Sequence, residues 1–133
     1  MVLVDTSVII DALQGTKNKA TESFRNIIEN KIEYGISVLT YQEILQGARD
    51  LNEELQLQDY LDTQKIYRLP QDLSFYCSAA RYRRQLRQKG ITIRNTVDIL
   101  IAMTASHYGL KLLHNDRDFD YLISEMEYLE EYL

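Results

Sequence analysis

Four acidic residues stand where their carboxylates could share one site. Asp5 follows the short β-branched run at 2–4 and Asp116 follows a second apolar run, and such runs are typical of buried strands. Glu43 and Asp98 stand near the predicted starts of two helices. Carboxylates that converge raise one another's pKa, and a divalent cation removes the repulsion. An oxygen-lined site of this kind suits Mg²⁺ or Mn²⁺ and points to metal-assisted chemistry.

Each of these acids also has a purely structural interpretation. Asp5 and Asp116 can each cap the helix that follows. Glu43 can be the reciprocal half of a Thr40-x-x-Glu43 capping box. Asp98 can favour the dipole of its own helix. Four independent caps would have no need to face a single crevice, so convergence of the four side chains is the feature that separates the two interpretations.

The elements that would position these acids alternate along the chain between strand and helix periodicities. Strands are expected at 2–4, 34–39, 65–69, 111–113 and 127–132. Helices are expected at 8–14, 18–30, 40–46, 51–61, 72–90, 96–108 and 118–125. This alternation predicts a parallel sheet with helices on both faces. In such sheets ligands bind in the crevice beyond the carboxyl ends of the strands, where Asp5 and Asp116 are expected.

Composition predicts one compact domain over residues 1–133. The chain is 45% hydrophobic, with one Pro and five Gly, which fits a single core without a long linker. No basic region precedes the first strand, and no apolar run approaches the roughly 18 residues of a membrane span. We therefore expect no signal peptide, no membrane contact and a cytoplasmic location. The lone Cys77 cannot form an internal disulfide, and we expect it to be a buried thiol.

The net charge of −5 argues against indiscriminate nucleic-acid binding, but the charge is unevenly spread. Residues 81–94 contain six basic residues and no acid. This stretch can be a solvated helix face. Alternatively, some of its arginines contact RNA phosphates or an acidic partner. The candidates for this second role are Arg81, Arg84, Arg87 and Arg94.

Four ordered segments resemble the PIN-domain nucleases, in particular the VapC-type toxins of bacterial and archaeal toxin–antitoxin pairs. The resemblance covers essentially the whole chain, and the ordered set is more specific than any single motif. The segments are Leu3-Val4-Asp5-Thr6-Ser7, Thr40-x-x-Glu43, Val97-Asp98-Ile99-Leu100-Ile101-Ala102 and Leu112-Leu113-His114-Asn115-Asp116-Arg117-Asp118-Phe119.

The resemblance implies a three-layer α/β/α PIN-like fold with a central five-stranded parallel sheet, and a Mg²⁺- or Mn²⁺-dependent endoribonuclease. Asp5, Glu43, Asp98 and Asp116 match the four catalytic acids of that family. Three of them, Asp5, Asp98 and Asp116, would be direct or water-mediated metal ligands. Glu43 would ligate the metal or orient the attacking water. The expected products carry a 5′-phosphate and a 3′-hydroxyl.

Further residues match supporting positions of the family. Asp118 matches an additional, less central acid, and Thr6 or Ser7 matches the small hydroxyl residue beside the first acid. His114 departs from the pattern, because this position usually holds Thr or Ser, whose hydroxyl helps to order the site. The histidine can replace that hydrogen bond, contact a phosphate or alter the metal preference.

The resemblance also implies partners: an RNA substrate, a cognate antitoxin that inserts a segment at the acidic crevice, and a second copy in a homodimer. Two alternatives stay open. One is a catalytically weakened PIN-like module that binds RNA or protein, and the other is a housekeeping RNA-processing nuclease. A haloacid-dehalogenase-like phosphatase would need a second Asp where this chain has Ser7, and the glycine fingerprint of dinucleotide-binding domains is absent.

Overall fold

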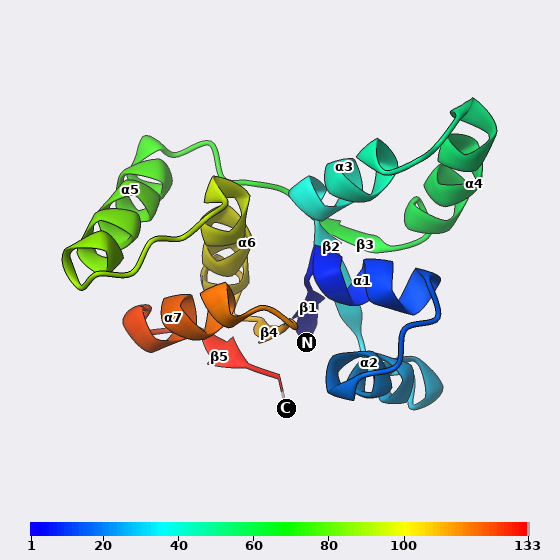
Figure 1. Ribbon diagram of the computed structural model, residues 1–133, viewed down its shortest axis with the longest axis horizontal. Coiled ribbons are helices and arrows are strands. Elements are labelled where there is room, and N and C mark those ends of the chain that lie inside the picture. The colour runs from blue at the N-terminus through cyan, green and yellow to red at the C-terminus, as the bar shows by residue number, and fades with distance from the viewer. Residues whose placement is uncertain (133) are drawn as a thin grey trace.

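Five parallel strands form the centre of the protein, whose computed structural model describes residues 1–132 (Figure 1). In sheet order the strands run β3-β2-β1-β4-β5, and every neighbouring pair is parallel. The predicted five-stranded parallel sheet is confirmed. The strands are β1 (Val2–Val4), β2 (Tyr34–Ser37), β3 (Lys65–Tyr67), β4 (Lys111–Leu113) and β5 (Glu130–Glu131).

Helices cover both faces of this sheet and complete the predicted α/β/α arrangement. The helices are α1 (Thr6–Leu13), α2 (Lys19–Glu29), α3 (Val38–Gln46), α4 (Leu51–Leu61), α5 (Leu73–Gln88), α6 (Thr96–His107) and α7 (Arg117–Glu125). In Figure 1, α1 to α4 lie to one side of β1, and α5, α6 and α7 lie to the other. No helix within residues 1–132 is long and apolar enough to cross a membrane.

The central strand β1 feeds both halves of the core, because successive side chains of a strand point to opposite faces. Leu3 packs in the cluster formed with α5, α6 and α7. Val2 and Val4 pack in the cluster formed with α1 to α4. All three side chains are buried, as expected for a parallel strand covered on both faces. The first strand is thereby fixed from both sides.

The strand register brings the first and last of the four acids to one edge of the sheet. Val4 of β1 lies opposite Leu113 of β4, and the Asp5 backbone N–H donates to the Leu113 carbonyl at 2.9 Å. The ends of β1 and β4 therefore lie next to each other at the same edge of the sheet. Asp5 and Asp116, which follow these strands, emerge at the same end.

The structure differs from the sequence prediction where β2 meets α3. The strand ends at Ser37 instead of 39, because the Ser37 hydroxyl accepts from the Leu39 N–H and caps the helix. Thr40 therefore lies inside the first turn of α3, and Glu43 lies one turn later. The predicted Thr40–Glu43 capping box is wrong. Because Ser37 caps the helix instead, the side chains of Thr40 and Glu43 are free to make other contacts.

Other differences are smaller. Helix α1 begins at Thr6, earlier than predicted, because Asp5 caps it. The strands β3 and β5 are shorter than the expected 65–69 and 127–132. Cys77 is exposed on α5, so the expectation of a buried thiol is wrong.

Candidate metal centre

The four acids line a single pocket beyond the carboxyl ends of β1 and β4. Asp5 and Asp116 come from the strand ends, Glu43 from α3 and Asp98 from the first turn of α6. The remaining lining residues are Thr6, Ser7, Ile10, Arg94 and Asn95. Acids separated by as many as 111 positions in the sequence (116 − 5) are thus neighbours in space.

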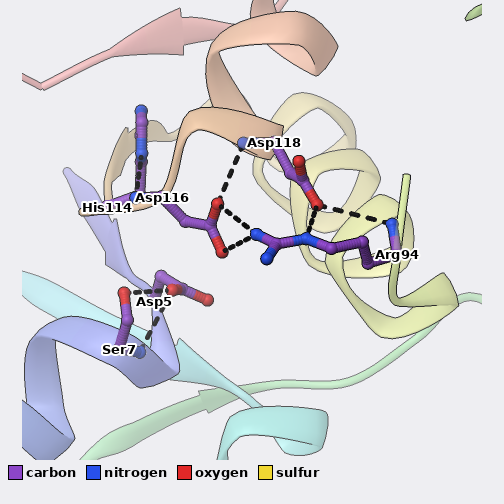
Figure 2. Close-up of polar contacts among 6 residues, drawn as sticks. All are labelled: Asp5, Ser7, Arg94, His114, Asp116 and Asp118. Atoms are coloured by element: carbon purple, nitrogen blue, oxygen red, sulfur yellow. Dashed lines mark hydrogen bonds and ion pairs between the residues drawn. The ribbon is translucent and has the colours of Figure 1, made fainter. Parts of the chain in front are cut away.

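Asp5 is both a helix cap and a pocket residue. Its Oδ2 accepts from the Ser7 N–H at 3.1 Å and from the Ser7 hydroxyl at 2.6 Å (Figure 2). The residue is only 3% exposed. Both bonds use the same oxygen, and the other one extends away from Ser7 in Figure 2. The capping and functional interpretations are therefore compatible, because the cap fixes the carboxylate while leaving its second oxygen to the pocket.

The Thr6 hydroxyl connects α1 to α3 through Glu43. Thr6 Oγ1 lies 2.7 Å from Glu43 Oε1 and 3.0 Å from Thr40 Oγ1. A hydroxyl carries a single proton, and a carboxylate is the stronger acceptor. Thr6 therefore donates to Glu43 and accepts from Thr40. This chain of bonds fixes the direction of the Glu43 side chain.

Asp116, Asp118 and Arg94 form an ion-pair network at the opposite wall of the pocket (Figure 2). Asp116 Oδ1 accepts from the Asp118 N–H at 3.0 Å, which caps α7. Arg94 Nη2 lies 3.2 Å from Asp116 Oδ1, and Arg94 Nε donates to Asp118 Oδ2 at 3.2 Å. Asp118 is buried, so Arg94 compensates one buried and one partly exposed carboxylate. Hydrogen bonding and attraction to Asp118 raise the pKa of Arg94.

Burial and nearby carboxylates disfavour ionisation of Asp5 and Asp98. Burial raises the pKa of Asp5, although hydrogen bonds from Ser7 and Thr6 oppose the shift. Burial raises the pKa of Asp98 to about 7, and repulsion from Asp5 and Asp116 adds to this effect. Near neutral pH a substantial fraction of Asp98 is therefore protonated when no cation is bound.

Whether these residues fit a divalent metal depends on the spacing of their oxygens and on the ionisation of their carboxylates. Asp98, Asp116 and Asp118 each offer an oxygen within 4.8 Å of the others, and Asp5 lines the same pocket as Asp98 and Asp116. All of these donors are carboxylates, which Mg²⁺ and Mn²⁺ prefer. A bound cation would favour the ionised forms that burial and repulsion disfavour. The residues fit Mg²⁺ or Mn²⁺.

His114 is buried beside this pocket but does not line it. Its Nδ1 accepts from the Asp116 backbone N–H at 3.2 Å. In Figure 2 the ring extends away from the carboxylates of Asp5 and Asp116. Of the roles considered for this histidine, the structure shows a hydrogen bond, to the backbone of Asp116, and the phosphate contact and the effect on metal preference stay predictions.

The basic candidates divide into two groups. Arg94 lines the acidic pocket, whereas the other three, Arg81, Arg84 and Arg87, are exposed on α5 outside its lining. Asn95 caps α6 and also lines the pocket, and it is not among the site residues predicted from the sequence. The Asn95-x-x-Asp98 spacing is a usable signal, because an N-cap side chain and the third helical residue lie together at a helix start.

A comparison with protein families gives an independent result. A family model described as "PIN domain" matches residues 2–123, a range that includes all four acids. The chain belongs to the PIN domain family. This PIN domain is 30% identical over 121 residues to VapC ribonuclease Mb1587 of Mycobacterium bovis and to Ribonuclease VapC11 of Mycobacterium tuberculosis. In both cases the match covers 90% of this chain and 90% of the relative.

Solved structures confirm the PIN fold. The chain resembles a chain of VapBC2 from Rickettsia felis, solved bound to a promoter DNA fragment, with a TM-score of 0.72, 22% identity and 99% coverage of each chain. It also resembles a chain of FitAcB from Neisseria gonorrhoeae, with a TM-score of 0.68 and 20% identity. That match covers 98% of this chain and 97% of the other. At these identities the likeness bears on the fold alone.

Proposed function

We propose that this PIN domain protein is a metal-dependent endoribonuclease that acts as the toxin of a toxin–antitoxin pair. The observation that carries the proposal is the shared pocket of Asp5, Glu43, Asp98 and Asp116. Support comes from relatives named VapC ribonucleases, which align over 90% of the chain. RNA is the proposed substrate, and phosphodiester hydrolysis is the proposed reaction.

In this proposal Asp5, Asp98 and Asp116 hold Mg²⁺ or Mn²⁺, directly or through water. When bound, such a cation supplies charge stabilisation at the phosphate and lowers the pKa of a coordinated water. The bonds from Ser7 to Asp5 and from Asp118 to Asp116 hold two of the ligands in place before metal arrives. Preorganised ligands of this kind lose little freedom on binding.

The remaining pocket residues act on the water and the RNA. Glu43, held by Thr6 at 2.7 Å, orients the attacking water for in-line displacement and takes up its proton. Arg94 contacts a phosphate of the RNA, while Asp118 keeps its guanidinium at the pocket wall. The water oxygen bonds to phosphorus, the bond from phosphorus to the 3′-oxygen breaks, and that oxygen takes a proton from solvent, which leaves a 5′-phosphate and a 3′-hydroxyl.

A cognate antitoxin is the proposed inhibitor, and a second copy of the chain is the proposed partner in a homodimer. Support for the antitoxin comes from structural neighbours described as toxin–antitoxin complexes, including one from Klebsiella pneumoniae. Leu13, Leu55 and Tyr60 expose apolar surface on α1 and α4, and an interface with either partner would cover such side chains.

The direct test is RNA cleavage by purified wild type, Asp5→Asn and Asp59→Asn. Asp59 is an exposed acid on α4 and serves as a control of equal charge change. We expect Mg²⁺-dependent cleavage by wild type and Asp59→Asn, abolition by EDTA, and at least about a 100-fold loss in Asp5→Asn. Cleavage by Asp5→Asn at the wild-type rate would contradict the proposal.

A further inference from the structure

His114 lies between the backbone N–H of Asp116 and the carboxylates of Glu131 and Asp120. Its Nδ1 faces the Asp116 backbone N–H at 3.2 Å. Its Nε2 lies 3.1 Å from Glu131 Oε1 on β5 and 3.5 Å from Asp120 Oδ1 on α7. The side chain is only 4% exposed, and its ring packs against Phe119 at a centroid distance of 5.2 Å. A buried ring thus connects β5 and α7 to a pocket acid.

One interpretation of this cluster is a second metal site. His114, Asp120 and Glu131 each offer a ligand atom within 4.8 Å of the others. Tetrahedral Zn²⁺ would hold a histidine nitrogen and a carboxylate oxygen about 3.3 Å apart. The distances of 3.1 and 3.5 Å bracket that value, so spacing alone permits a metal.

The proton positions on the ring decide against it. Because Nδ1 accepts from the Asp116 N–H, it carries a lone pair and no proton. The proton of the neutral ring is then on Nε2. A metal would need the lone pair of Nε2, and a metal-bound histidine normally donates its other ring N–H. Here the Asp116 N–H already points at that other nitrogen, so Nε2 is a donor toward the two carboxylates.

We infer that His114 is a positioning residue for Asp116, held in its Nε2–H tautomer by the carboxylates of Glu131 and Asp120. The inference rests on the proposed metal-dependent function. Nε2 is buried and faces both carboxylates without the alignment of a regular hydrogen bond, so the attraction is electrostatic. Nδ1 in turn fixes the backbone at the residue that carries a proposed metal ligand.

The effect of this bond is to fix the base of the Asp116 side chain. The contacts from the Asp118 N–H and from Arg94 hold its carboxylate end, whereas His114 holds the backbone N–H. If the backbone is released, the carboxylate can move with the loop that joins β4 to α7. Loss of such an outer contact typically weakens metal binding by about 10 to 100-fold.

Two substitutions separate the functions of the two ring nitrogens. In His114→Asn the side-chain oxygen stands close to the Nδ1 position and can accept from the Asp116 N–H. In His114→Gln the amide reaches toward Glu131 and Asp120 but places no acceptor at the Nδ1 position. Both variants lose the ring contact with Phe119, so a loss of stability common to both does not distinguish them.

The measurement is Mn²⁺ affinity by isothermal titration calorimetry, with Asp5→Asn as the variant that tests the pocket itself. We expect His114→Asn to bind within about threefold of wild type and His114→Gln to bind about 10 to 100-fold more weakly. Equal affinity in both variants would overturn the positioning role and leave the proposed function intact. Failure of wild type to bind Mn²⁺ through Asp5 would contradict the proposed function and with it this inference.

Nitrogen NMR of the His114 ring gives a readout that does not depend on a loaded site. We expect a protonated Nε2 and an unprotonated Nδ1 in metal-free wild type. A protonated Nδ1 would overturn the inference. So would Zn²⁺ binding that shifts the Nε2 resonance and is lost in Glu131→Ala, because that result would establish the metal site instead.

Discussion

The acidic side chains in the pocket serve the proposed function but destabilise the folded protein when no metal is bound. Asp5 is buried, and the pKa of Asp98 is raised to about 7 by burial and by neighbouring carboxylates. Ionising these groups in the absence of a cation therefore opposes folding. Arg94 pairs with Asp116 and Asp118. It attracts Asp98 through charge but forms no hydrogen bond with it in the described part of the chain, so a bound metal would relieve the repulsion that remains at Asp98.

The raised pKa predicts how stability depends on pH. Between the ordinary Asp value of 3.8 and about 7, the folded protein retains a proton that the unfolded chain has lost. The free energy of unfolding of the metal-free protein should therefore decrease as pH rises through this window. Asp98→Asn should flatten the decrease and be more stable than wild type at about pH 8. Urea unfolding in EDTA checks this, and equal pH slopes in both proteins would contradict it.

The hydroxyl of Thr6 leads to a second prediction about a single side chain, this time for the rate of cleavage. Thr6→Val removes the hydroxyl that donates to Glu43 at 2.7 Å, and a hydrogen bond to a charged group contributes about 1.5–3 kcal/mol. We expect kcat to fall by about tenfold or more while KM for RNA changes little, because Glu43 acts on the water. Thr6→Ser keeps the hydroxyl and should stay close to wild type. Equal kcat in Thr6→Val and wild type would refute the role of this bond.

At the level of strands and helices, the sequence predicted order better than boundaries. The apolar runs at 2–4 and 111–113 matched β1 and β4, because buried parallel strands need continuous hydrophobic residues. The start of α3 was missed because Ser37 and Thr40 are both good N-caps. The choice of Ser37 depends on where β2 stops pairing with β3, at Tyr67, which is a tertiary contact.

In the candidate site, the residues were predictable from the sequence but their contacts were not. Each of the four acids was predictable from its place after a strand or near a helix start, and the structure brings all four to one pocket. Contacts between distant elements were not predictable, since no local pattern encodes them. The bond from Thr6 to Glu43 and the ion pairs of Arg94 are of this kind.

The close packing of β2 and β3 gives a prediction about the sheet. A Cβ at Gly35 would lie 2.6 Å from Tyr67 Cε2 and 2.7 Å from the Lys65 carbonyl oxygen. Gly35→Ala should therefore lower the free energy of unfolding by about 1–3 kcal/mol through overpacking. Gly47→Ala is the control, because Gly47 has a helical φ of −80° and a Cβ there meets the nearest atom at 3.5 Å. Urea unfolding of both variants checks the prediction, and equal stabilities would contradict it.

Across the whole molecule, the net charge of −5 restricts where RNA can approach. Arg84 and Arg87 are exposed on α5, and they offer positive charge outside the acidic pocket. If they contact phosphates, reversing their charge should reduce the salt dependence of RNA affinity. The expected reduction is about 0.7 in the log–log slope for each lost contact with a single strand.

The measurement is RNA affinity against salt for Arg84→Glu with Arg87→Glu, made in Asp5→Asn so that the RNA stays intact. Arg25→Glu on α2 is the control, because Arg25 is also exposed and carries the same charge, and the slopes are compared per reversed charge. A flatter slope in the α5 variant than in the control is expected. Equal slopes in the two would mean that this face is solvated and does not contact RNA.

Anomalous diffraction from crystals grown with Mn²⁺ would test whether acids distant in the sequence share one divalent cation. We expect an Mn²⁺ peak bounded by the carboxylates of Asp5, Asp98 and Asp116, and loss of that peak in Asp98→Asn. A wild-type map with no peak in this pocket, or with the ion bound elsewhere, would show that these acids do not share a metal ion.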